Sequence, residues 1–299
     1  MANEQVIHQL FLTELCNQNC LFCSYDRKSV NKKDPSLAQL KEIIGKIPHN
    51  PGEIVIDGGE PTIRKEFFEI VALAKGRNPR KITLCTNGLM LSYPEFAKKV
   101  KFSGITQVLI SLHSHKSEIA DRITRVEGSF SKTVKGVKNL VKEGVIVSLS
   151  FVINELNYKE ILEYVQFTDK EFGKTHITFS FVMPSGNALV NKWTVPKIST
   201  VVPYLKTALK YCVDKGISFS FTGCSIPPCF LKGYEQYTGE FLLRDNKYLM
   251  ERESGERIRK ISEGKVKPES CRSCEYDSVC GGLWEKYVEM YGDGEIKKI

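Results

Sequence analysis

Short apolar runs alternate with amphipathic stretches along the first 216 residues of the chain. Six runs rich in β-branched and aromatic residues predict strands at Ile7–Thr13, Glu53–Asp57, Lys81–Thr86, Gln107–Ser111, Val145–Ile153 and His176–Val182. Apolar residues at helical spacing predict helices at Leu37–Ile47, Glu66–Lys75, Pro94–Val100, Ser131–Glu143, Lys159–Lys170 and Thr200–Lys215. Strands that alternate with helices are typical of parallel α/β folds. Six such units predict a partial (β/α)6 TIM-like barrel.

The pattern changes after Gly216. Ile217–Phe221 could form one more strand, but the chain then runs through a long charged segment into a cysteine-rich tail. These residues include too few apolar side chains for a stable core of their own. We therefore expect a barrel over residues 1–216 and a small extension over residues 217–299 that a metal centre organises.

Composition narrows the class of protein. The chain has 299 residues, 41% hydrophobic and 26% charged, as in ordinary soluble proteins. The net charge of +8 suits solubility, and it would also suit an anionic substrate or an acidic peptide. Its cations are interspersed and form no basic stripe, which argues against nucleic-acid binding. We find no signal peptide and no apolar run long enough for a membrane span. Ten cysteines in a chain of expected cytoplasmic location favour metal or redox chemistry over disulfides.

Three cysteines follow the first predicted strand as Cys16-x3-Cys20-x2-Cys23. Three thiolates on one loop can hold three irons of a [4Fe-4S] cluster and leave the fourth iron open to another ligand. Zinc would need a fourth ligand from elsewhere in the chain and stays an alternative at this point.

With Phe22 before its last cysteine, this loop resembles the CxxxCxxC loop of the radical S-adenosylmethionine (SAM) superfamily. Asp57-Gly58-Gly59-Glu60-Pro61 resembles its GGEP motif, and Thr86-Asn87-Gly88 is a third matching feature; each follows a predicted strand. The resemblance covers about Val6 to Gly186. It implies a [4Fe-4S] cluster on Cys16, Cys20 and Cys23 that binds SAM and cleaves it reductively to a 5′-deoxyadenosyl radical, which abstracts hydrogen from a substrate.

The resemblance also implies SAM contacts. Glu60 and the backbone at the two glycines would bind the amino group, because a residue without Cβ lets the backbone approach a ligand closely. Arg125, or as second choice Arg122, would pair with the carboxylate, unless it forms only a surface salt bridge. His113 is either a proton carrier or an exposed loop histidine without a role. The complete set of expected cofactor contacts is Phe22, Gly58, Gly59, Glu60, Pro61, Thr86, Asn87, Ser111, Arg125, Ser150, Asn154 and Met183.

Five cysteines lie in the tail. Cys271-x2-Cys274-x5-Cys280 is similar to part of the SPASM and twitch extensions of the superfamily, which hold auxiliary clusters. The further cysteines of a full SPASM pattern are absent after Cys280, so the resemblance implies one auxiliary [4Fe-4S] cluster in a twitch-like extension. We assign its ligands as Cys229, Cys271, Cys274 and Cys280; Cys224 in place of Cys229, and zinc in place of the cluster, stay open.

Cys224 is left over from this assignment. Some radical SAM epimerases quench the substrate radical with a cysteine hydrogen atom, which makes Cys224 a candidate catalytic residue. Cys85 lies inside a predicted strand and Cys212 on a predicted helix, so both are expected to be buried apolar residues.

An auxiliary cluster in this superfamily often accompanies peptide chemistry. The resemblance therefore favours a radical SAM oxidoreductase or maturase that acts in ribosomal peptide or protein maturation, with a small molecule or cofactor precursor as the alternative substrate. Expected partners are an electron donor such as flavodoxin or ferredoxin and, because the first strand begins close to Met1, a separate leader-peptide recognition protein. A non-catalytic iron–sulfur electron carrier and a zinc-binding nucleic-acid protein are the alternatives from other classes.

Overall fold

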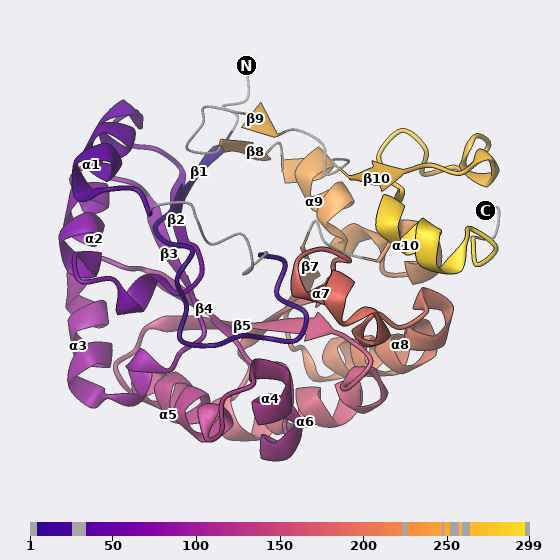
Figure 1. Cartoon of the computed structure of the whole chain (residues 1–299), viewed down its shortest axis with the longest axis horizontal. Helices are drawn as coiled ribbons and strands as arrows, with labels where there is room; N and C mark the ends of the chain where they lie inside the picture. The colour runs from indigo at the N-terminus through magenta and orange to yellow at the C-terminus, as the bar shows by residue number, and fades with distance from the viewer. Residues whose placement is uncertain are drawn as a thin grey trace.

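The computed structural model describes residues 5–25, 34–222, 226–246, 248–251, 257–258 and 264–296. Within these residues, nine strands form one curled sheet in the order β7-β6-β5-β4-β3-β2-β1-β8-β9 (Figure 1). Seven of them, β1 to β7, pair in parallel with their neighbours in sequence. Their bounds are Gln5–Phe11 (β1), Glu53–Asp57 (β2), Lys81–Thr86 (β3), Gln107–Ser111 (β4), Ile146–Ile153 (β5), His176–Phe181 (β6) and Phe219–Phe221 (β7). The predicted partial barrel is confirmed.

Helices cover the outer side of this sheet (Figure 1). They are α1 (Leu37–Lys46), α2 (Phe67–Lys75), α3 (Pro94–Ser103), α4 (Ser117–Thr124), α5 (Ser129–Lys142), α6 (Ile161–Phe172) and α8 (Ile198–Lys215). The short helix α7 (Asn187–Val190) instead contacts the loop that follows β1. Helix α1 begins with a capping box. The Ser36 hydroxyl accepts from the Gln39 backbone N–H, and the Gln39 side-chain oxygen accepts from the Ser36 backbone N–H. Helices α4 and α7 were not expected. Neither has a side-chain N-cap hydrogen bond, and α7 is a single turn.

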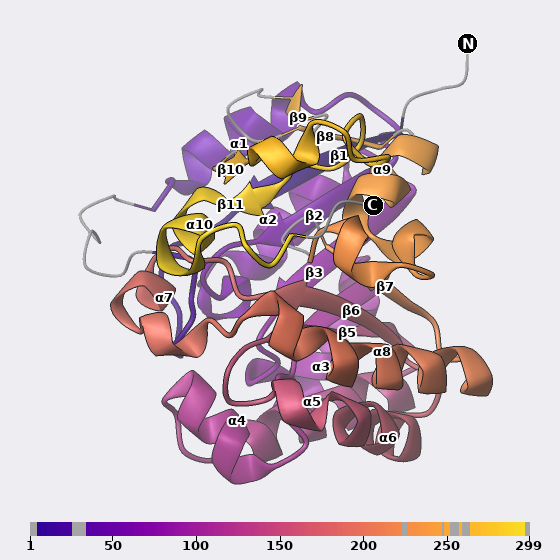
Figure 2. The ribbon, with the colours of Figure 1, turned by 90° about the vertical axis from the view of Figure 1, so that its right-hand side faces the viewer.

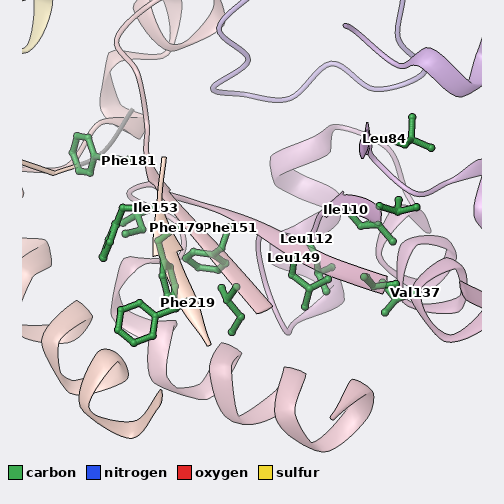
Figure 3. Close-up of a cluster of buried hydrophobic side chains, with 14 of the residues drawn as sticks. Leu84, Ile110, Leu112, Val137, Leu149, Phe151, Ile153, Phe179, Phe181 and Phe219 are labelled. Carbon is green, nitrogen blue, oxygen red and sulfur yellow. The ribbon is translucent and has the colours of Figure 1, made fainter. Parts of the chain in front are cut away.

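The two faces of the sheet differ in chemistry because side chains alternate along each strand. The face toward the helices is apolar, and Figure 3 shows Phe151, Phe179 and Phe219 gathered on β5, β6 and β7. The Phe151 ring lies 4.2 Å from that of Tyr164 on α6 and 6.0 Å from that of Phe179. Burying each such side chain contributes about 1.5–3 kcal/mol, so this layer holds the helices against the sheet.

The inner, concave face is mixed: apolar residues such as Val55 and Leu109 alternate with polar ones, whose side chains bond across the strands. Gln9 Nε2 on β1 donates to Asp57 Oδ2 on β2 at 3.0 Å, and Gln107 Nε2 on β4 donates to Ser148 Oγ on β5 at 2.7 Å. On β3, Lys81 pairs with Glu53 of β2 at 3.1 Å. The concavity therefore offers amides, hydroxyls and carboxylates beside apolar side chains, unlike the face that packs on the helices.

Elements from residues 217–299 lie at both edges of the sheet. Strand β7 joins β6, while β8 (Tyr248–Glu251) pairs in parallel with β1 at the opposite edge, followed by β9 (Arg257–Ile258). Helix α9 (Gly239–Asn246), the two-stranded sheet of β10 (Lys265–Val266) and β11 (Leu283–Trp284), and α10 (Glu285–Tyr291) complete the extension. The Tyr287 hydroxyl of α10 accepts from the Ile198 N–H that starts α8.

No helix in the described part of the chain is long and apolar enough to cross a bilayer.

Candidate active site

The three-cysteine loop follows β1 at the carboxyl ends of the parallel strands. The Cys16, Cys20 and Cys23 thiols are all half-buried. Cys16 Sγ accepts from the Gln18 N–H at 3.4 Å and from Asn87 Nδ2 at 3.7 Å. N–H donors directed at sulfur favour a thiolate, which is the form that binds metal.

The two glycines of the GGEP-like motif let the strand ends pack closely. Gly59 N–H donates to the Thr13 carbonyl at 2.6 Å, and Glu60 N–H donates to that of Leu15 at 2.8 Å. A Cβ on Gly59 would lie 2.3 Å from the Leu15 oxygen, and one on Gly58, whose φ is +143°, would lie 2.6 Å from the Thr13 oxygen. The structure thus gives these glycines a packing role: without a Cβ, they admit the backbone that leads into the cysteine loop.

Glu60 ties the end of β2 to the end of β3. Its fully buried carboxylate accepts from Thr86 Oγ1 at 2.7 Å, from the Asn87 N–H at 2.7 Å, and from the Thr62 N–H and hydroxyl. Burial raises the pKa of Glu60, and the hydrogen bonds oppose this shift. Oε1 receives three of these bonds and Oε2 one, so any contact of Glu60 with a ligand ammonium is limited to Oε2.

Thr86 and Asn87 extend the same network. The Thr86 hydroxyl is committed to Glu60, and Asn87 Nδ2 donates to Asn17 Oδ1 in the cysteine loop at 2.7 Å. Pro61, the first residue of the 3-10 turn Pro61–Ile63, is buried beside them. The motifs that follow β2 and β3 therefore support one side of the cysteine loop.

Helices α4 and α7 support the other side of this loop (Figures 1 and 2). The Leu21 N–H donates to the Ile123 carbonyl of α4 at 2.8 Å. From α7, the Asn187 N–H donates to the Cys23 carbonyl and its Nδ2 donates to that of Cys20, both at 2.8 Å. Asn191 Nδ2 donates to the Leu21 carbonyl at 2.9 Å. These two asparagines are not among the residues expected from the sequence, where their i, i+4 spacing after β6 is their only signal.

His113 is buried rather than exposed, so the expectation of an exposed loop histidine is wrong. Its Nδ1 accepts from the Val152 N–H at 3.2 Å, which leaves the proton of the neutral ring on Nε2. Its ring contacts that of Phe22 edge-on at 5.1 Å. Burial lowers the pKa of His113 to about 4, so near pH 7 the ring is neutral, with a proton on Nε2 alone. With Ser111, it lines a small cavity.

The remaining expected SAM contacts are dispersed. Ser150 is half-buried on the inner face of β5, and Met183 is half-buried just past β6. Asn154 is fully buried, and its amide is used in the turn after β5, where Nδ2 donates to the Val152 carbonyl at 2.9 Å. Arg125 is exposed at the end of α4, with one guanidinium nitrogen 3.5 Å from Asn191 Oδ1. Arg122 lies over the Trp193 ring at 5.6 Å.

Four tail cysteines surround one cavity. It is lined by Cys229, Cys271, Cys274 and Cys280, among other residues. Burial, followed by the nearby thiols of Cys280, Cys274 and Cys271, raises the pKa of Cys229 to about 12. The structure thus brings together the four residues assigned to the auxiliary centre. Cys224 lies outside the described residues.

Among the described residues, no three Cys, His, Asp or Glu side chains converge closely enough to hold one metal ion. A single zinc ion with bonds of about 2.3 Å would need its thiolates within about 4 Å of one another. In an iron–sulfur cluster each cysteine binds its own iron, so the thiols surround the cluster instead of meeting at a point. Thiols grouped on one loop or around one cavity fit that requirement.

The other two cysteines differ from each other. Cys212 is fully buried in α8, as expected. Cys85 is half-buried on the inner face of β3, where burial and the Asp57 carboxylate raise its pKa.

A model of the radical SAM superfamily matches residues 10–168, more than half of the chain. The chain belongs to the radical SAM superfamily. A probable GTP 3′,8-cyclase of Saccharolobus islandicus is 30% identical over 161 residues, which make up 53% of this chain and 51% of that protein. This radical SAM chain thus spans about half the length of the curated relatives it matches.

Solved structures share the fold over more of the chain. Streptococcus suis SuiB bound to precursor peptide SuiA has a TM-score of 0.67 at 14% identity, covering 99% of this chain and 75% of that one. The protein anSMEcpe, with bound AdoMet (SAM) and Kp18Cys peptide, has a TM-score of 0.65 at 15% identity, covering 93% of this chain and 88% of that one. At these identities the likeness shows the fold.

Proposed function

We propose that this radical SAM protein cleaves SAM reductively and uses the resulting radical to modify a peptide or protein. The observation that carries the proposal is the loop with Cys16, Cys20 and Cys23, which is supported from both sides at the carboxyl ends of the strands. A [4Fe-4S] cluster bound there would supply the electron that splits SAM into methionine and a 5′-deoxyadenosyl radical, which takes hydrogen from the substrate.

The chain's own residues would position SAM. We propose Phe22, Ser111, Ser150 and Met183 as contacts with the nucleoside or the methionine carboxylate. Ser111 and Ser150 are on the inner face of the sheet, Phe22 is in the cysteine loop, and Met183 follows β6. Glu60, Thr86 and Asn87 support the loop, with Oε2 of Glu60 available to a ligand ammonium. Because these groups are already hydrogen-bonded, little reorganisation is needed when SAM binds.

The inner face of the sheet favours a peptide over a nucleotide. On the described strands β1 to β7, Lys81 is the one Lys or Arg that faces inward, and it is paired with Glu53 at 3.1 Å. A triphosphate is normally recognised by several cations. Amide and hydroxyl side chains such as Gln9, Ser111 and Ser150 suit the backbone of a peptide instead. The similarity to SuiB, solved with a precursor peptide, also supports this substrate class.

The second candidate is a small-molecule or cofactor-precursor substrate. The 30% identity to a probable GTP 3′,8-cyclase favours it. This identity covers about half of each chain.

We further propose that residues 217–299 hold one auxiliary [4Fe-4S] cluster through Cys229, Cys271, Cys274 and Cys280. Four thiols lining one cavity support this ligand set. Zinc is the rival occupant, and Cys224 stays a proposed hydrogen-atom donor.

An anaerobic assay tests the function. Reconstituted protein with SAM and dithionite should form 5′-deoxyadenosine, and Cys20→Ala should form none, whereas the buried Cys212→Ala control should retain cleavage. Deuterated candidate peptides, encoded by short reading frames beside the gene, and deuterated GTP are then offered separately. Deuterium in 5′-deoxyadenosine with the peptide supports the proposal; deuterium with GTP alone would establish the second candidate. Wild-type protein that never cleaves SAM would rule out both.

A further inference from the structure

An exposed apolar surface lies where α7 joins the 3-10 turn Lys192–Thr194. Val190 is 64% exposed and Trp193 is 47% exposed. The Arg122 guanidinium from the last turn of α4 lies over the Trp193 ring at 5.6 Å. Large apolar side chains that are exposed together often mark a contact with another protein.

Cations surround this surface. Arg122, Arg125 and Lys192 are exposed. Asp121, which lies on the same helix, is turned inward and accepts from the Gly128 and Phe130 N–H groups at 2.7 and 2.8 Å. Glu118, one turn before Arg122 on α4, and Glu127 are also exposed, so two acidic side chains of these segments stand against three cations.

The same two elements contact the cysteine loop directly. Asn191, which immediately precedes Lys192, donates to the Leu21 carbonyl at 2.9 Å. The backbone carbonyl of Ile123, next to Arg122, accepts from the Leu21 N–H at 2.8 Å. Leu21 lies between Cys20 and Cys23. The elements that carry this surface are therefore hydrogen-bonded directly to the loop that carries the thiols.

We propose that Arg122, Arg125, Val190, Lys192 and Trp193 form the docking surface of an acidic one-electron carrier protein of the flavodoxin or ferredoxin class. The inference rests on the proposed SAM cleavage, which takes up one electron each time: the carrier is oxidised by one electron, and the site gains that electron. A carrier here would not obstruct SAM or substrate, because it would approach through α4 and α7 while they use the inner face. Positive charge around an exposed tryptophan is complementary to an acidic partner.

The test compares two reductants on the same variants. Lys192→Glu reverses one charge of the surface, and Trp193→Ser removes its ring; neither side chain is among the proposed cluster or SAM contacts. Lys98→Glu on α3 makes the same charge change at an exposed position outside this surface. SAM cleavage is measured with dithionite and with limiting reduced flavodoxin of net negative charge at low salt, and flavodoxin binding is titrated separately.

With flavodoxin, Lys192→Glu should cleave SAM about tenfold more slowly, since a surface charge acts mainly on association. Trp193→Ser should bind flavodoxin more weakly. Lys98→Glu should match the wild type, all variants should keep the dithionite-driven rate, and added salt should reduce the difference. Unchanged flavodoxin binding and rate in both variants would overturn the inference.

Two other outcomes would also overturn it: loss of the dithionite-driven rate, which would make the surface structural, and loss of peptide modification alone, which would assign it to the substrate. Wild-type protein that binds flavodoxin at this surface but never cleaves SAM would sink only the proposed function.

Discussion

Asn187 and Asn191 are the residues whose role is clearest from hydrogen bonding alone. Together their amides satisfy two carbonyls of the cysteine loop at 2.8 and 2.9 Å. Each such bond contributes about 1 kcal/mol, which is small for the whole protein but acts on a loop that must hold three thiols in place. We expect Asn187→Ala and Asn191→Ala to lose cluster iron to a chelator several-fold faster than wild type, as followed by visible absorbance.

Asn139 provides the matched control for this prediction. Its amide also satisfies a loop carbonyl, that of Leu91, at 2.9 Å, but away from the cysteine loop. Asn139→Ala should lower the unfolding free energy by a similar amount and leave the rate of iron loss unchanged. Equal iron loss in all three variants would mean that global stability, rather than the asparagines of α7, retains the cluster.

His113 predicts a pH dependence of stability. Its pKa is about 4 in the folded protein because it is buried, against about 6.5 in an unfolded chain. The unfolded state therefore binds the proton first, so this contribution is complete above pH 6.5 and is lost as the pH falls from 6.5 toward 4. His113→Gln keeps an acceptor for the Val152 N–H and does not titrate. Its urea-unfolding free energy should fall less steeply than that of wild type over this range.

The exposed His49 is the control for His113. His49→Gln should reproduce the wild-type profile. If His113→Gln also shows the wild-type slope, the imidazole is not held neutral by the fold.

At the residue scale, the sequence singles out residues whose type and spacing suggest a chemistry, but not those whose role depends on where the fold places them. Cysteines attract attention by their spacing, and Cys229, Cys271, Cys274 and Cys280 do line one cavity. An asparagine in a one-turn helix carries no such signal, because its importance depends on which loop the fold brings beside it. The burial of His113 likewise arises from Phe22 and Val152, which are distant in sequence.

At the scale of elements, the close contact between the GGEP-like turn and the segment that enters the cysteine loop is the most constrained part of the site. A Cβ on Gly59 would lie 2.3 Å from a backbone oxygen, which cannot move as a flexible side chain would. Gly59→Ala should therefore push the two loops apart, lower stability by roughly 1–3 kcal/mol, and reduce the iron bound after reconstitution. Urea unfolding and iron assay measure both effects.

Gly45 supplies the opposite case. It lies within α1 with open space where a Cβ would be placed, so Gly45→Ala should stabilise the protein by up to about 1 kcal/mol through helix propensity and leave iron content unchanged. A Gly59→Ala variant as stable and as iron-loaded as wild type would contradict the close contact.

Element prediction depended on periodicity. The bounds of β2, β3 and β4 agree with the sequence because these strands are short apolar runs that end in turn-forming residues. Helix α4 was missed because its first turn is charged and uncapped, although Ala120 and Ile123 bury its inner side. The pairing of β8 with β1 could not be foreseen, because it joins residues more than 200 positions apart and no local pattern encodes such a register.

At the scale of the whole molecule, the extension is joined to the barrel it follows. Strand β8 lies beside β1, the strand that leads into the cysteine loop, and the Tyr287 hydroxyl caps the start of α8. A small segment that lacks a large core gains stability from such contacts as well as from any metal it holds. These contacts with β1 and α8 do not depend on a metal centre in the extension, so the extension can stabilise the barrel without one.

The two proposed clusters have separate cysteine ligands, so substitutions can remove one cluster at a time. With four irons in each cubane, the reconstituted wild type should contain about eight irons per chain, and Cys271→Ser with Cys274→Ser should contain about four. Cys16→Ala with Cys20→Ala should also retain about four irons, but only the tail variant should still cleave SAM with dithionite, because its first cysteine loop is intact. Zinc in place of iron in the Cys16/Cys20 variant would assign the tail cavity to a structural zinc site. Unchanged iron in the tail variant would remove Cys271 and Cys274 from the ligand set, since two missing thiolates cannot leave a cubane fully held.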